Sequence, residues 1–226
     1  MQFEDLMDAW ELTTLIIGEV LLTLAAFSAI IALIVFSIRK PIRKHKPIDM
    51  LIFDKIRPRV NTVNNKFMLF ITFLGKHQFL IPANLILIFY FLLVKRQTWF
   101  SIRVITIAIS SLVLMLLLKQ LFQRKRPLSP LLKAAKGLSF PSGHAIMAVT
   151  FYGLLIYILQ HTITTEWLKW FLIILVFVLI VLIGFSRIYL RVHYASDVAA
   201  GFIIGLLWLL LSLAVLKWLE GYVTSL

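Results

Sequence analysis

Six long stretches of this sequence contain no Asp, Glu, Lys or Arg, and they constrain its fold more than any other feature. They cover residues 20–38, 77–94, 104–118, 145–165, 170–186 and 198–216. A helix of about 20 apolar residues crosses the hydrocarbon core of a bilayer, whereas the strands of a membrane barrel are about 10 residues long and alternate in polarity. The sequence therefore predicts an all-α integral membrane bundle of six transmembrane helices, in a single membrane-embedded domain over residues 1–226.

The composition excludes both a water-soluble domain and a disordered chain. Hydrophobic residues make up 61% of the 226 residues and charged residues only 15%, where soluble domains have about 25% charged residues and disordered chains are poor in apolar residues. In so apolar a chain, the net charge of +13 indicates phosphate at a membrane surface or a topological bias, and not a nucleic-acid partner. The absence of cysteine excludes disulfides and cysteine-ligated metals.

The first 76 residues contain two segments that need separate interpretation. Residues 1–11 carry four acidic residues and no Lys or Arg, unlike the positive start of a cleavable signal peptide, so we expect residues 13–38 to form a retained first helix. The longest connection follows, over residues 39–76. Four apolar residues in it recur at helical spacing: Ile48, Leu51, Ile52 and Ile56. They predict an interfacial amphipathic helix that frames a lipid entrance, although a basic loop with some apolar residues fits the pattern equally well.

Three clusters of polar residues interrupt the apolar pattern at the ends of predicted spans. They are the segments 119–127, 141–144 and 186–197. Because consecutive spans alternate in direction, the end of the third and fifth spans and the start of the fourth and sixth lie at one membrane face. Polar residues are costly in hydrocarbon and mark functional sites, so their convergence predicts one site at that face.

The residue types in these clusters suit the binding and transfer of a phosphoryl group. Such transfer requires positive charge around the three equatorial oxygens of the phosphorus, which Lys119, Arg126 and Arg187 supply. Ser142 adds a hydroxyl donor. Gly143 allows close approach of the backbone at the start of a helix, where free N–H groups attract anions.

A histidine and an aspartate in the third cluster have the spacing of a nucleophile and its orienting partner. His193 and Asp197 are four residues apart and share one face if this segment is helical. A carboxylate that binds one ring nitrogen leaves the other nitrogen free to attack.

The three clusters together resemble the signature motifs of the type 2 phosphatidic acid phosphatase family, also called the lipid phosphate phosphatase and vanadium haloperoxidase superfamily. The matching patterns are Lys119 followed after six residues by Arg126-Pro127, then Pro141-Ser142-Gly143-His144, then Ser186-Arg187, His193 and Asp197. The resemblance makes residues 119–197 the motif core. It implies that His193 attacks phosphorus and forms a phosphohistidine, that Asp197 orients it, and that His144 protonates the leaving lipid oxygen before water hydrolyses the intermediate.

Other polar residues are expected to have no part in this chemistry. After Asp54 the only acidic residues are Glu166, Asp197 and Glu220, and the first and last of these are predicted at the opposite face, so we expect no metal site and no cofactor. Basic residues outside the motif positions are expected to be solvated or interfacial charges: Arg124, Lys125, Lys133 and Lys136. Three histidines without a surrounding motif are expected to be structural: His45, His77 and His161.

The predicted function is that of a membrane lipid phosphatase that releases phosphate from a lipid phosphomonoester or pyrophosphate. Phosphatidic acid, phosphatidylglycerol phosphate, undecaprenyl pyrophosphate and a lipid A phosphate all remain open, because the motifs contact phosphate and not the chains. A lipid-linked phosphotransferase with the same site and a non-catalytic lipid-binding membrane protein are the alternatives. The expected partners are the lipid substrate and the bilayer, with neither nucleic acid nor an obligate protein partner.

The orientation of the chain in the membrane is predicted differently by charge and by resemblance. Eighteen Lys and Arg residues fall on the predicted motif face and five on the other, which by the positive-inside rule places the motifs in the cytoplasm. The resemblance to bacterial members instead implies a site on the outer face of the inner membrane. Because part of this charge is catalytic in type, we predict the bacterial inner (plasma) membrane, with the active site on the periplasmic or extracytoplasmic face.

Overall fold

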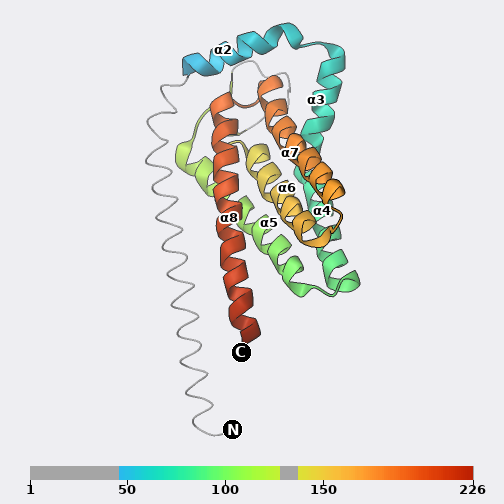
Figure 1. The fold of residues 1–226 in the computed structure, drawn as a ribbon. Helices are drawn as coiled ribbons and strands as arrows, with labels where there is room; N and C mark the ends of the chain where they lie inside the picture. The colour runs from blue at the N-terminus through green and yellow to red at the C-terminus, as the bar shows by residue number, and fades with distance from the viewer. Residues whose placement is uncertain (1–45, 128–136, 226) are drawn as a thin grey trace. The chain divides into compact units, whose positions relative to one another are not determined.

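The computed structural model describes residues 46–127 and 137–225 (Figure 1). Every regular element in these ranges is helical and none is a strand, which confirms the all-α class for this part of the chain. The predicted first helix over residues 13–38 lies outside the described residues, so a bundle of six spans stays a prediction. Three residues expected to be uninvolved also lie outside them: His45, Lys133 and Lys136.

Five of the described helices are long and apolar enough to cross a membrane. They are α4 (His77–Phe89) with its π-helical continuation η2 (Tyr90–Val94), α5 (Thr98–Phe122), α6 (Gly143–Thr162), α7 (Glu166–Tyr189) and α8 (Ala195–Ser225). Each contains or nearly matches one of the last five apolar stretches of the sequence. A helix satisfies all its backbone hydrogen bonds internally, which is why such stretches form helices in lipid.

Helix α6 lies at the centre of the bundle and packs against α5, α7 and α8. Its contact with α8 is close near the end that carries the motifs. A β-carbon on Gly201 would lie 2.9 Å from the backbone oxygen of Ser142 and 2.8 Å from the β-carbon of Ala145. Small residues of this kind let membrane helices approach each other closely, and here the approach brings the second turn of α8 against the start of α6.

The outward faces of α7 and α8 carry large apolar side chains that no other part of the described chain covers. Exposed residues of this kind are Phe171, Ile174, Leu175, Phe177, Val178, Ile203, Leu206, Leu207 and Leu210. A soluble monomer rarely exposes so large an apolar area, whereas lipid chains cover it at no cost. The packing therefore agrees with the membrane location that the sequence predicts.

Two helices occupy the connection before α4. They are α2 (Lys46–Ile56), followed by the 3₁₀ turn η1 (Arg57–Arg59), and α3 (Thr62–Leu74). The alternative of a basic loop is therefore wrong for residues 46–56, and α3 is a helix that the sequence reasoning missed. In Figure 1, α2 lies across the ends of α7 and α8 while α3 runs along α7.

The apolar residues predicted to form one face of α2 do not all lie on its buried side. Phe53 and Ile56 are buried, but Ile48 and Leu51 are 53% and 61% exposed, so the predicted apolar stripe divides between the protein and the surroundings. The buried face also contains Asp49, which is 1% exposed.

Candidate active site

The predicted site residues come together at one end of the bundle, where α5 and α7 end and α6 and α8 begin. The backbone N–H of Ser142 donates to the backbone oxygen of Asp197 at 3.1 Å, which ties the second motif to the third. Ser142, Arg187, His193 and Asp197 are all at most 5% exposed. The site is therefore formed of buried polar groups, as expected for groups that must act on a substrate away from water.

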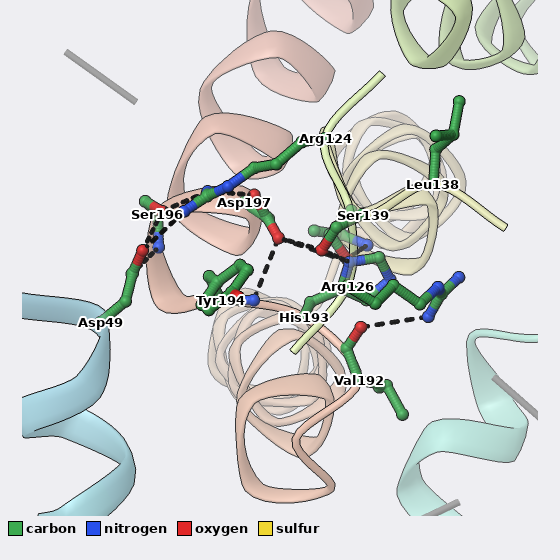
Figure 2. A network of polar contacts seen from close by, with 12 residues as sticks. Asp49, Arg124, Arg126, Leu138, Ser139, Val192, His193, Tyr194, Ser196 and Asp197 are labelled. Carbon is green, nitrogen blue, oxygen red and sulfur yellow. Dashed lines mark hydrogen bonds and ion pairs between the residues drawn. The ribbon is translucent and has the colours of Figure 1, made fainter. Parts of the chain in front are cut away.

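The Asp197 carboxylate accepts hydrogen bonds from the residue just before α8 and from the loop before α6 (Figure 2). Its Oδ2 atom accepts hydrogen bonds from the Tyr194 backbone N–H at 3.0 Å and from the Ser139 hydroxyl at 2.5 Å. The Nδ1 atom of His193 lies 3.8 Å from the same oxygen and 3.4 Å from the Ser139 hydroxyl. Because α8 begins at Ala195, the histidine and aspartate meet across a helix start and not on one helical face.

His193 has the protonation state that a nucleophile requires. Burial lowers the pKa of its imidazole to about 4, and the charges of Arg187 and Arg126 act in the same direction, against the raising effect of the Asp197 contact. The ring is therefore neutral near pH 7, and one of its nitrogens carries a free lone pair. A neutral imidazole beside a carboxylate is the arrangement of a nucleophile with its orienting partner.

Arg187 and His144 each present a buried nitrogen that has no hydrogen-bond partner. Arg187 donates from Nη1 to the Thr72 hydroxyl at 2.5 Å, but its Nε atom is unpartnered, as is Nε2 of His144. In the part of the chain that the structure describes, the only other such nitrogen is Nε of Arg103, at the opposite end of the bundle. Buried polar atoms are almost always hydrogen-bonded, so two such nitrogens in one site indicate that an acceptor such as a phosphate oxygen is the missing partner.

The two basic residues of the first motif contact backbone oxygens and not carboxylates. Lys119 Nζ donates to the Leu138 oxygen at 2.9 Å. Arg126 donates from Nε to Gly137 at 3.2 Å and from Nη1 to Val192 at 3.1 Å. Burial lowers the pKa of Arg126, against the opposing effect of Asp197. Neither cation is within salt-bridge distance of a carboxylate in the described ranges, so their charge stays available to an anion.

The second motif begins α6. The hydroxyl oxygen of Ser142 accepts from the backbone N–H of Ala145 at 3.4 Å, which makes this serine the N-cap of the helix. A β-carbon on Gly143 would lie 2.5 Å from Sδ of Met115, so the glycine allows α5 to approach the helix start closely. The motif thus places a helix N-terminus, which attracts anions, beside His144.

Arg124 differs from its expected role as a solvated or interfacial charge. Its side chain is only 11% exposed and bridges two carboxylates, at 2.5 Å from Asp197 Oδ1 and 2.9 Å from Asp49 Oδ2. Lys125, by contrast, is exposed as expected. The expectation for Arg124 was wrong because it rested on the motif positions alone, whereas the partner Asp49 lies 75 residues away in the chain.

Three further residues that contact the site were not predicted: Asp49, Thr72 and Ser139. A sequence signal for Asp49 existed, because it shares the i, i+4, i+7 face of α2 with the buried Phe53 and Ile56. An acidic residue on an apolar face needs a partner. Among the described residues no group of three or more His, Asp or Glu side chains has the arrangement of a metal site. Glu166 pairs with Lys169, and Glu220 pairs with Arg103 at the end opposite the motifs.

Comparisons with known proteins identify the class. The model of the PAP2 superfamily matches residues 100–220. Phosphatidylglycerophosphatase B of Bacillus subtilis (strain 168) is 35% identical over 147 residues, which are 63% of this chain and 70% of that protein.

Two solved structures have a similar fold. The transmembrane PAP2-type phosphatidylglycerolphosphate phosphatase from Bacillus subtilis has a TM-score of 0.67 at 32% identity, and the match covers 75% of this chain and 84% of that one. Aquifex aeolicus LpxE has a TM-score of 0.55 at 26% identity, with coverage of 73% and 94%.

The fold and the comparisons thus define an integral membrane enzyme with a cluster of buried polar residues at one end of its helical bundle. The chain belongs to the PAP2 superfamily, which confirms the resemblance drawn from the three motifs. It is a membrane lipid phosphatase, a hydrolase of phosphoric esters.

Proposed function

We propose that this enzyme cleaves the phosphomonoester bond of an anionic lipid with His193 as the nucleophile. The observation that carries this proposal is the pair of orphan buried nitrogens, on His144 and Arg187, beside a buried neutral imidazole that contacts Asp197. This arrangement provides a nucleophile, a group that delivers a proton and a cation within one enclosed site.

The reaction proceeds in two balanced steps. Nε2 of His193 attacks phosphorus, the bond from phosphorus to the lipid oxygen breaks, and His144 gives that oxygen a proton. Water then attacks the phosphohistidine and returns a proton to His144, which releases inorganic phosphate and regenerates the imidazole. Three cations, Lys119, Arg126 and Arg187, neutralise the phosphate oxygens in both steps, and the helix start at Ser142 and Gly143 adds N–H donors.

Phosphatidylglycerol phosphate is the first substrate to test. The similar sequence and the similar structure from Bacillus subtilis are both named for its dephosphorylation, whereas the motif residues suit phosphate and do not select the lipid chains. Phosphatidic acid, undecaprenyl pyrophosphate and a lipid A phosphate complete the panel.

The deciding assay is phosphate release by the detergent-solubilised protein, wild type against His193→Ala. We expect release from at least one lipid of the panel and a loss of at least about 1,000-fold in the variant, as for removal of other catalytic nucleophiles. Transfer of phosphate to a second lipid without release would favour the phosphotransferase alternative. Activity that survives His193→Ala would exclude the proposed mechanism.

We also propose that the enzyme resides in the inner membrane with the site on the extracytoplasmic face, and that α2 is an interfacial helix at the lipid entrance. The exposed Ile48 and Leu51 support the second proposal, since α2 otherwise places them in water. A test of orientation uses Lys125→Cys near the site and Lys217→Cys near the other end, in a chain without native cysteine. A membrane-impermeant thiol reagent on intact cells should label the first and not the second.

A further inference from the structure

Arg124 lies between the active site and α2, and both terminal nitrogens of its guanidinium donate to protein groups. Nη1 donates to the Ser196 hydroxyl at 2.8 Å and to Asp197 Oδ1 at 2.5 Å, and Nη2 donates to Asp49 Oδ2 at 2.9 Å. The guanidinium also stacks over the Tyr194 ring, 4.2 Å from its centroid. Figure 2 shows this network beside His193.

Asp49 fixes the other side of this network. Its Oδ1 accepts from the Ser196 backbone N–H at 3.0 Å and its Oδ2 accepts from the Ser196 hydroxyl at 2.8 Å. A carboxylate that is 1% exposed is stable only when it is paired and hydrogen-bonded. Asp49 therefore joins α2 to the first turn of α8, the turn that carries Asp197.

We propose that Arg124 and Asp49 are positioning residues, which hold the Asp197 carboxylate in the orientation that His193 requires. The proposal rests on the proposed function, since it presumes that His193 is the nucleophile and Asp197 its orienting partner. The two oxygens of Asp197 have different partners. Oδ1 accepts from Arg124, whereas Oδ2 accepts from the Ser139 hydroxyl and the Tyr194 N–H and lies beside His193. Loss of the contact at Oδ1 removes the ion pair on one side of the carboxylate and leaves only the donors at Oδ2 to hold it toward the histidine.

The contacts of Arg124 separate this role from phosphate binding. Both of its terminal nitrogens already donate to protein oxygens, whereas Lys119 and Arg126 bind only backbone carbonyls. Arg124 is therefore expected to act on the rate of the chemical step and not on affinity for phosphate. Interactions made through a second residue of this kind commonly change activity by about 10- to 100-fold.

The experiment measures kcat, KM and inhibition by inorganic phosphate for Arg124→Met, Arg124→Lys, Asp49→Asn and the double variant Asp49→Asn/Arg124→Met. For Arg124→Met we expect kcat to fall roughly 10- to 100-fold, with KM and the phosphate inhibition constant within about 2-fold of wild type. Arg124→Lys should recover part of kcat because it retains the cation. Asp49→Asn should lower kcat by about 3- to 10-fold. The double variant should be no worse than Arg124→Met, since residues in one network are not additive.

Matched controls remove a charge of the same sign at a nearby position, one residue from Arg124 and five residues from Asp49. Lys125→Met and Asp54→Asn alter exposed residues that make no contact with this network, and both should keep wild-type kcat. Thermal unfolding of each variant in detergent identifies any that fail to fold. If Arg124→Met does not fold, Arg124→Lys and Asp49→Asn decide the question.

Two results would overturn the proposal. One is wild-type kcat in Arg124→Met or, should that variant not fold, in Asp49→Asn. The other is a rise of more than about 10-fold in the phosphate inhibition constant of a folded Arg124 variant, which would make Arg124 a phosphate-binding residue. Failure of the proposed function is distinct, because it appears as an inactive wild type or an active His193→Ala.

Discussion

The Nδ1 atom of His193 lies 3.8 Å from Oδ2 of Asp197, while the Ser139 hydroxyl donates to that same oxygen at 2.5 Å. The carboxylate is thus oriented by the loop before α6 as well as by its own helix. The pair proposed for catalysis, His193 and Asp197, is therefore held in part by a residue outside the three motifs.

Ser139→Ala should lower kcat by about 3- to 10-fold and leave KM within about 2-fold, because Asp197 loses one of the donors that fix its rotamer. Ser139→Thr retains the hydroxyl and should be closer to wild type. Steady-state phosphate release from the preferred lipid measures both. An unchanged kcat in Ser139→Ala would show that the serine contact does not orient the carboxylate.

The acid limb of the pH profile should lie far below that of an ordinary histidine. Because burial lowers the pKa of His193 to about 4, the imidazole stays neutral as the pH falls from 8 through 6.5 and gains a proton only near pH 4. We expect kcat/KM to stay high through the ordinary histidine range and to decline only as the pH approaches 4. Samples returned to pH 7 after each measurement control for denaturation. A midpoint near 6.5 would contradict this pKa.

Thr72→Val should weaken the binding of phosphate. Arg187 donates to the Thr72 hydroxyl at 2.5 Å, and without this acceptor the guanidinium is less well fixed in a buried site. KM and the phosphate inhibition constant should rise about 3- to 10-fold. Thr106→Val, the same change at an exposed position of α5, should leave both constants unaltered, and equal effects of the two changes would argue against the role of Thr72.

Gly201→Ala should destabilise the fold and reduce activity. The added β-carbon would lie 2.9 Å from a backbone oxygen of α6, and backbone cannot move aside as a flexible side chain can. Overpacking of this kind costs about 1–3 kcal/mol. Gly221→Ala, where an added β-carbon has nothing within 4 Å, is the control. Thermal unfolding in detergent should show a lower midpoint only for Gly201→Ala.

The helices with the most uniform composition were predictable from sequence. The last five apolar stretches correspond to α4 through α8, because length and the absence of charge are local properties that decide whether a segment crosses lipid. Helix α3 was missed because Asn64, Asn65 and Lys66 interrupt its apolar pattern. Whether residues 46–56 form a helix or a loop was left open, because a short amphipathic pattern fits both.

The motif residues were identifiable because phosphate chemistry requires particular side chains at fixed spacings, and the alternation of membrane spans brings these to one face. The sequence determined the family, the apolar spans and the residues proposed for catalysis. Only the tertiary structure decided which groups position them: Asp49 and Arg124 are 75 positions apart, and Thr72 and Arg187 are 115 apart. The local sequence pattern does not predict such pairs, because their members come into contact only when the helices pack together. A charge that this packing buries is stable only when it is paired and hydrogen-bonded.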